Sequence, residues 1–313
     1  MKEELFVSGR NIPNIDPYLH LWHWEIPLYL FLGGLSAGIL FFAGYFYVLR
    51  KERDMAATIK WAPMFVPFFL VIGLGALFLD LHHKLYFWRL YTIIRLESPM
   101  SWGAWTLLVI TPLSILWAFT YVRETWKNIK WPWKWVYTVE SFLIQYRKAM
   151  AWIMMILAII LGVYTGILLS AFNARPLWNT SILGPLFLVS GFSTGLAFII
   201  LMSKSKYERK VLTRIDLIFI FTELFFIIHM LMGLQAGTQV SIEAANLFLG
   251  GEFTVTFWVY VVILGLAFPA TLEVLELRGY HVPGWLPSAL ILFGGLVFRF
   301  VILEAGQITR YLY

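Results

Sequence analysis

Eight long apolar runs limit the folds open to this sequence. Because a helix rises 1.5 Å per residue, each run can cross about 30 Å of hydrocarbon. Backbone polar groups cannot stay unpaired in lipid, and the runs lack the strict alternation of barrel strands. We therefore predict an all-α membrane protein with eight transmembrane helices in a single integral membrane domain, residues 1–313. The predicted spans lie near 24–49, 62–81, 101–122, 150–171, 182–202, 215–237, 254–275 and 286–305.

The composition excludes several other classes of protein and site. Only 13% of the residues are charged, whereas a soluble domain has about a quarter. The sequence contains no cysteine, so it can hold no thiolate zinc site and no iron–sulfur cluster. Only His229 lies well inside a run, and a haem held by two histidines is therefore not expected. We also expect no metal site, because the neighbouring His82 and His83 would diverge on a helix.

Lys and Arg are distributed unequally between the two sides of the predicted bundle. The segments after the first, third, fifth and seventh runs carry 16 of them, whereas the termini and the remaining segments carry 7. The more basic side of a membrane protein faces the cytoplasm. We therefore expect both termini outside, in a bacterial or archaeal cytoplasmic (inner) membrane. Because the basic residues lie in short segments between apolar runs, we expect no nucleic-acid partner.

Two spans share a motif of small residues, at positions 34–38 (GLSAG) and 191–195 (GFSTG). Glycine and serine at this spacing let two helices approach closely. The motifs would also begin two parallel halves of four helices each, residues 24–171 and 182–305. Close packing and an internal repeat both remain open at this point.

Ionisable residues inside the apolar runs are costly, at about 2.5–3.5 kcal/mol each at the bilayer centre. Asp216 is expected to begin the sixth span at the inner surface. Glu223 follows seven residues later on the same helical face, about 10 Å deeper. This spacing favours a proton path through the two carboxylates. The alternatives are an ordinary end-of-helix acid at Asp216, and a structural hydrogen bond or a salt bridge from Glu223 to Arg299.

A second group of polar residues is expected at the outer edge of the bundle. His and Asp can exchange protons with a quinone, Tyr can donate a hydrogen bond to its carbonyl oxygen, and Trp can wall its ring. These residue types together favour a site for a carrier of two electrons and two protons. Its members are predicted to be His20, His23, Tyr29, Asp80, His82 and Tyr164.

Four segments of the sequence resemble the membrane subunits of the polysulfide-reductase type, the NrfD/PsrC family. They are residues 24–34 (WEIPLYLFLGG), residues 79–81 with 98–103 (LDL, SPMSWG), residues 164–166 with 176–180 (YTG, PLWNT), and Arg299 with 305–307 (AGQ). The segments occur in the family's order over nearly the whole chain. The sequence departs from the family pattern after position 81, where His82, His83 and Lys84 replace Gly and Pro.

The resemblance implies eight helices without haem and one quinone site near the outer face. It also implies a ferredoxin-like iron–sulfur subunit as a partner, connected to a molybdopterin or other catalytic subunit. Tyr29, Asp80 and Tyr164 would lie around the quinone. The remaining family positions, Asp216, Glu223 and Arg299, would be proton-transfer or structural charges.

Three functions therefore remain open for this sequence. The leading interpretation is a quinone-reactive anchor of a respiratory oxidoreductase, which passes electrons between menaquinone or ubiquinone and an extracytoplasmic iron–sulfur subunit. Proton translocation is an open extension of that role. A secondary transporter or ion-translocating subunit also fits intramembrane acids and glycine-rich helices. A purely structural anchor would leave the charges inside the apolar runs unexplained.

Overall fold

The computed structural model describes residues 22–126, 128 and 130–310. All regular secondary structure in this part of the chain is helical, and eight of its helices are long and apolar enough to cross a membrane. The predicted class and number of spans are therefore confirmed. The spans are α2 (Glu25–Val48), Ala57–Asp80 with α3 (Val66–Asp80), α5 (Pro99–Thr125), α7 (Arg147–Ser170), α8 (Leu183–Met202), α9 (Lys206–Gln235), Thr256–Leu277 with η5 (Thr256–Ala267) and α11 (Phe268–Leu277), and α12 (Trp285–Ile308).

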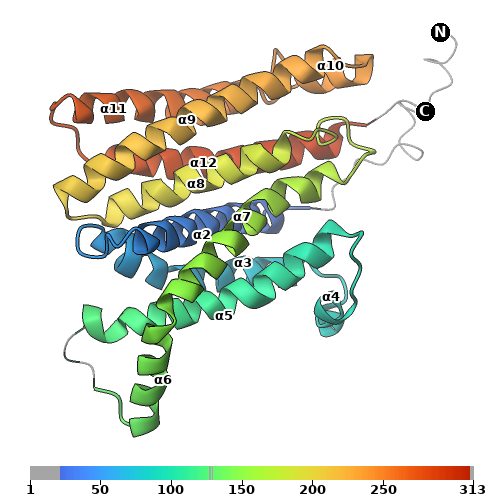
Figure 1. The fold of residues 1–313 in the computed structure, drawn as a ribbon. Helices are drawn as coiled ribbons and strands as arrows, with labels where there is room; N and C mark the ends of the chain where they lie inside the picture. Colours follow the sequence, from blue (N-terminus) through green and yellow to red (C-terminus); the bar gives the residue numbers. More distant parts are fainter. Residues whose placement is uncertain (1–21, 127, 129, 311–313) are drawn as a thin grey trace, which may run out of the picture.

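The spanning helices lie side by side, and the first and last described residues meet at one end of the bundle (Figure 1). The backbone N–H of Trp22 donates to Gln307 Oε1 at 3.0 Å, and Gln307 Nε2 donates to the carbonyl oxygen of Trp22 at 2.9 Å. We call this end the terminus face and the other end the opposite face. The short helices α4 (Arg89–Thr92) and α10 (Gln239–Asn246) lie at the terminus face, and α6 (Lys134–Gln145) lies at the opposite face.

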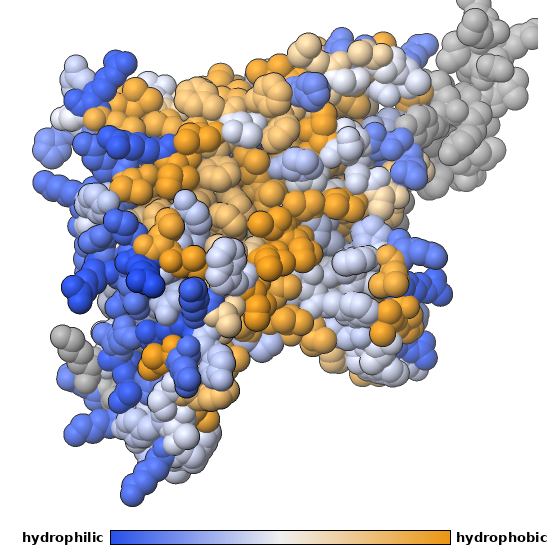
Figure 2. All heavy atoms as spheres, in the orientation of Figure 1, coloured by the Kyte–Doolittle hydropathy of each residue, from blue (hydrophilic) through white to orange (hydrophobic). Residues whose placement is uncertain are grey.

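The surface has the pattern expected of a chain that spans a bilayer. Figure 2 shows a hydrophobic band across the middle of the molecule, with hydrophilic residues gathered at the two ends. Large apolar side chains of the spanning helices are exposed, among them Phe68, Ile218 and Phe221 at 60% or more. In water such a surface would be unfavourable, whereas lipid chains can cover it.

The two small-residue motifs pack against one another at the centre of the bundle, between α2 and α8. A Cβ atom built on Gly34 would lie 3.3 Å from the Cα of Gly191, and one built on Gly38 would lie 3.0 Å from the Cα of Gly195. Larger residues would therefore force the two helices apart. The predicted packing is confirmed, whereas the proposed halves 24–171 and 182–305 remain a prediction.

The sixth span begins earlier than the sequence predicted. Helix α9 starts at Lys206, where the hydroxyl of Ser205 accepts a hydrogen bond from the backbone N–H of Glu208 at 3.4 Å. Basic residues occupy its first turns, so the apolar run understated its length. Asp216 consequently lies ten residues inside the helix and is fully buried. Its expected position at the inner surface is therefore wrong.

The second span also begins earlier, and a buried carboxylate from α9 caps it. Glu208 accepts hydrogen bonds from the backbone N–H groups of Ala57 at 3.3 Å and Thr58 at 2.8 Å, and from the Thr58 hydroxyl at 2.8 Å. The first N–H groups of a helix have no partner within it, so this contact satisfies two of them. The span ends at Asp80, as predicted.

Candidate functional site

Two tyrosines predicted from the sequence meet near the terminus face. Tyr29 of α2 is 2% exposed, and its hydroxyl lies beside that of Tyr164 of α7 but has no hydrogen-bond partner among the described residues. A Cβ atom on Gly103 of α5 would overlap the Tyr164 ring, so this glycine makes room for the phenol. A buried hydroxyl without a partner is unfavourable, and a ligand oxygen could satisfy it.

A third tyrosine, which was not predicted from the sequence, belongs to this group. Tyr91 of α4 interacts electrostatically with Tyr29, and its carbonyl oxygen accepts a hydrogen bond from Trp105 Nε1 at 3.3 Å. Burial raises the pKa of Tyr91, which keeps its phenol protonated. Tyr91 lies in a short helix outside the apolar runs, and no periodic pattern marked it. We call Tyr29, Tyr91 and Tyr164 the tyrosine cluster.

An apolar cleft of about 450 Å³ lies between α5 and α7, and Tyr164 forms part of its wall. We call it the Tyr164 cleft. Its size and apolar lining are typical of sites for small hydrophobic ligands, which place a few polar groups among many apolar ones. The other lining residues are Glu97, Pro99, Trp102, Ile159, Ile160, Val163 and Ile167. Tyr164 therefore belongs both to an apolar cleft and to the tyrosine cluster.

Acidic and histidine side chains gather where α2 begins and α3 ends. Asp80, at the end of α3, interacts electrostatically with Glu25 in the first turn of α2 and with His23 and His82. Asp80 is partly exposed, and both histidines are exposed. The structure thus brings three predicted residues together and adds Glu25, whereas His20 lies outside the described residues.

An aromatic group closes the terminus end of α2 and α12. Trp22 stacks on Trp178 with ring centroids 5.6 Å apart and meets Phe172 edge-on at 5.0 Å. Arg175 donates to the carbonyl oxygens of Gln307 at 2.8 Å and Thr309 at 2.7 Å, and burial lowers the pKa of its guanidinium. These contacts bind the last turn of α12 to the loop after α7.

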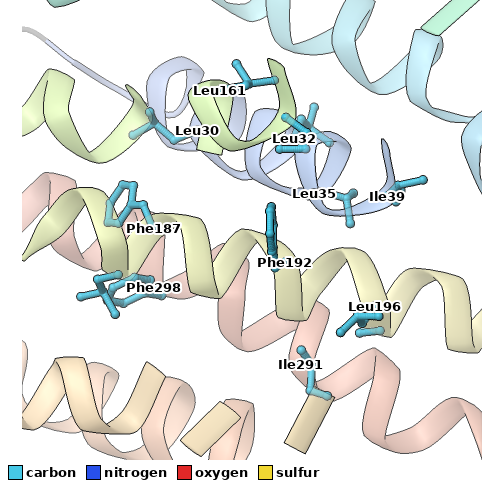
Figure 3. Packing of buried hydrophobic residues seen from close by; sticks show 14 of the residues in the cluster. Leu30, Leu32, Leu35, Ile39, Leu161, Phe187, Phe192, Leu196, Ile291 and Phe298 are labelled. Carbon is cyan, nitrogen blue, oxygen red and sulfur yellow. The ribbon is translucent and has the colours of Figure 1, made fainter. Parts of the chain in front are cut away.

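The intramembrane charges form a separate group between α8, α9 and α12. Arg299 Nη1 donates to the hydroxyl of Ser190 at 2.6 Å, and Ser190 also interacts with the carboxylate of Glu223. The Arg299 guanidinium lies 4.7 Å from the ring centroid of Phe187, and Figure 3 shows Phe187 facing Phe298 between α8 and α12. Ser190 therefore links Glu223 and Arg299, and the two charged side chains form no direct ion pair within 4.0 Å.

The same group continues toward the opposite face. The hydroxyl of Ser193 donates to Asp216 Oδ1 at 2.7 Å, and the other carboxyl oxygen of Asp216 lies beside Glu273 of α11. Glu273 is 1% exposed. Glu273 was not predicted as a site residue, because the predicted seventh span ended at 275 and this acid lay near its end. We call Glu273, Asp216, Ser193, Ser190, Glu223 and Arg299 the buried polar series.

His229, the one histidine well inside a predicted span, is exposed on the lipid-facing side of α9 and stacks on Phe225 with ring centroids 5.7 Å apart. It is therefore not part of the buried polar series. Among the described residues, no group of three or more His, Cys, Asp or Glu side chains is placed to hold a metal ion. The chemistry that the described side chains offer is hydrogen bonding and proton exchange.

Comparison with known proteins places the whole bundle in one family. Residues 14–310 match the family model described as "Polysulphide reductase, NrfD". The protein is 31% identical to the C subunit of polysulfide reductase from Wolinella succinogenes, over 92% of its own length and 94% of that subunit. It is also 31% identical to protein NrfD of Escherichia coli, over 92% of its own length and 96% of that protein. An NrfD homolog of Haemophilus influenzae is 29% identical, over 95% of this chain and 98% of the homolog.

The family match covers nearly the full length of the chain, including all eight spans. The relatives are also of nearly the same length as this chain. The chain therefore belongs to the NrfD family of the polysulfide reductase type, as a multi-pass membrane subunit of an oxidoreductase complex.

Proposed function

We propose that this chain is the quinone-reactive subunit of a respiratory oxidoreductase, with menaquinone or ubiquinone as its substrate. The observation that carries the proposal is the position of Tyr164, which lines an apolar cleft and lies beside the unpartnered hydroxyl of Tyr29. The cleft suits an apolar ring and tail, and the phenols suit a carbonyl oxygen.

The side chains divide the chemistry of the proposed site between them. Oxidation of a quinol releases two electrons and two protons, and reduction of a quinone takes up the same number. Tyr29 and Tyr164 would orient the substrate by donating hydrogen bonds to its oxygen. Asp80 and the adjacent His82 would exchange its protons with water at the terminus face, because both are at least partly exposed.

The electrons would pass to or from a ferredoxin-like iron–sulfur subunit, itself joined to a molybdopterin or other catalytic subunit. We propose that the iron–sulfur subunit docks on the terminus face over residues 82–100, beside the Tyr164 cleft. Lys84, Arg89 and Arg95 lie in this segment among exposed aromatic side chains. Crosslinks from the iron–sulfur subunit should map there, and crosslinks to 123–149 would contradict this docking site.

The terminus face would lie outside the cytoplasmic (inner) membrane, with the more basic opposite face inside. Because the protein has no natural cysteine, single introduced thiols report sidedness. An impermeant thiol reagent added from outside should label Glu252→Cys at the terminus face and should miss Asn128→Cys at the opposite face. The reverse pattern would invert the proposed orientation.

The buried polar series supports a further step in the proposal, the coupling of quinone chemistry to proton translocation. Asp216 interacts electrostatically with Glu223, so the carboxylates follow one another from the opposite face into the bundle. In the coupled model, Glu223→Gln should assemble and bind quinone but generate less membrane potential in proteoliposomes. A variant that generates the parent's potential would remove Glu223 from the path.

A quinone-binding titration tests the proposed function against the transporter alternative. The purified complex should bind a quinone-site inhibitor saturably, with about one site per complex, and the quinone should displace it competitively. Tyr164→Phe should weaken this binding about tenfold by removing one hydrogen bond to the ligand. The matched variant Tyr260→Phe, at a lipid-facing position of η5, should bind as the parent does. Absence of saturable binding in the assembled parent would contradict the quinone site.

A further inference from the structure

A polar cavity of about 490 Å³ lies at the opposite face, where α2 ends and α7 begins. It belongs to neither the Tyr164 cleft nor the buried polar series, and no proposed redox or proton step uses it. Its lining comes from the last turn of α2, the loop that follows and the start of α7. The residues that matter for its chemistry are Tyr47, Arg50, Glu52, Arg53, Asp54 and Lys148.

The two carboxylates of this cavity already have partners. Glu52 Oε1 accepts a hydrogen bond from the hydroxyl of Tyr121 at 2.8 Å and lies 3.5 Å from Arg147 Nη1. Asp54 lies 3.9 Å from the ammonium group of Lys51. Both negative charges are thereby offset by groups other than the three cations of the cavity wall.

The three cations of the wall have no such partners. Arg50, Arg53 and Lys148 form no ion pair and donate no side-chain hydrogen bond to any described residue. Like charges that share a cavity repel one another, and an anion between them would remove the repulsion. The cavity therefore has a net positive charge that the folded chain does not neutralise.

The backbone holds Arg50 in an unusual conformation. Its φ angle is 57°, the only positive φ at a residue other than glycine in the described part of the chain. A left-handed conformation costs a residue with a Cβ atom more than it costs glycine. This conformation ends α2, because the backbone N–H of Arg50 donates to the carbonyl oxygen of Tyr47 at 2.9 Å and that of Lys51 donates to Phe46 at 3.0 Å. The same helix end places the Arg50 side chain in the cavity wall.

The surroundings of the cavity resemble those of a lipid-headgroup layer. Nearby at the same face, α6 crosses the direction of the spanning helices (Figure 1). One side of α6 exposes Trp135, Phe142 and Tyr146, and the adjacent side exposes Lys134. A helix with exposed apolar and basic sides lies in the membrane interface, and Trp and Tyr mark the headgroup level. Lys148 follows α6 by three residues and lines the cavity.

We propose that this cavity binds the phosphate-bearing headgroup of an anionic phospholipid. Basic pockets at the ends of transmembrane helices suit such headgroups, because the cations reach the phosphate while the acyl chains remain in the bilayer. Arg50 and Arg53 would donate hydrogen bonds to phosphate oxygens, and Lys148 would add charge from the other wall. Phosphate chemistry alone would also admit inorganic phosphate, and we commit to the lipid because the cavity lies in the interface.

Cardiolipin titration of the delipidated full-length protein in detergent tests the proposal, with bound lipid counted by native mass spectrometry. Replacing the three cations together (Arg50→Gln, Arg53→Gln, Lys148→Gln) should weaken cardiolipin binding about a hundredfold. The matched control removes three exposed charges elsewhere on the same face (Lys204→Gln, Lys206→Gln, Lys210→Gln) and should bind within about twofold of the parent. If both triple variants lose cardiolipin affinity equally, the loss reflects general surface charge, and the proposed site is overturned.

Two further measurements separate lipid binding from folding and from free phosphate. Arg50→Gly relieves the positive φ angle, so it should keep or raise the Tm while weakening cardiolipin binding several-fold. A parent-like affinity in this variant would contradict the role of Arg50. Phosphatidylcholine should not compete, and inorganic phosphate should displace cardiolipin only at far higher concentration. Displacement by phosphate at concentrations equal to those of the lipid would overturn the lipid as the occupant.

Discussion

The Tyr164 cleft and the buried polar series contain polar groups of different kinds in different surroundings. The tyrosine cluster uses neutral hydroxyls beside an apolar cleft, with its acids and histidines at the exposed edge. The buried polar series holds three carboxylates and one guanidinium on α9, α11 and α12, each at most 2% exposed, together with two serines of α8. The first region can exchange a lipid-soluble ligand, whereas the second is closed to one.

This difference has an energetic reason. A neutral phenol in an apolar wall costs little when a ligand satisfies it, so a site can stand open to lipid. A charge in the same position costs several kcal/mol and must be enclosed by partners. We therefore expect loss of the Arg299 guanidinium to affect folding first, and substitutions at the cleft to affect quinone turnover first.

The largest effect is expected at Arg299. Arg299→Gln removes the guanidinium that interacts with Glu223 and with Ser190, and leaves a buried carboxylate without its cation. Leaving a buried charge without its compensating partner costs about 3–5 kcal/mol, enough to prevent accumulation of the folded chain. The yield of detergent-soluble, monodisperse protein measures this. Combining Arg299→Gln with Glu223→Gln should restore part of the yield, and no recovery would argue against the coupling.

The next largest effect is expected at Asp80. Asp80→Asn keeps the shape of the side chain but removes its charge and its ability to accept a proton, so quinone turnover should fall by about a hundredfold or more. The complex should assemble normally, because Asp80 is partly exposed. The same substitution at the opposite face, Asp54→Asn, serves as the control in a steady-state quinone assay. Parent-like turnover in Asp80→Asn would make this carboxylate structural.

A smaller effect is expected at Gly103. A Cβ atom there would overlap the Tyr164 ring, so Gly103→Ala should displace the phenol. Because overpacking of this kind costs about 1–3 kcal/mol, the KM for quinone should rise about tenfold. Gly75→Ala on α3 is the matched control, because its Cβ atom would meet nothing within 4 Å. If both variants show the parent's KM, the Tyr164 ring does not position the quinone.

The sequence predicted the eight spans because long apolar runs determine membrane insertion without reference to neighbouring helices. It also predicted that Asp80 ends a span, because an acid closes the apolar run there. The depth of Asp216 was missed because basic residues occupy the first turns of α9, and the role of Ser205 as a helix cap outweighs their polarity. Local sequence determines where a run is apolar, and caps determine where its helix begins.

Contacts between helices were harder to predict. The fit of Gly103 against Tyr164 joins residues about sixty positions apart, and no periodic pattern records it. Glu273 lay near a predicted span end, so its burial beside Asp216 depended on how α9 and α11 pack. The sequence did predict which residue types gather at the terminus face. Spans that end at the same side of the membrane bring their terminal residues to one face.

The most direct test is to find where a quinone binds. A photoreactive quinone analogue, illuminated in the assembled complex and mapped by peptide mass spectrometry, should label residues of the Tyr164 cleft, foremost Trp102 and Ile160 on its two walls. Excess quinone should abolish this labelling. Specific labelling of α9 or α12 around the buried polar series, with the Tyr164 cleft unlabelled, would contradict the account.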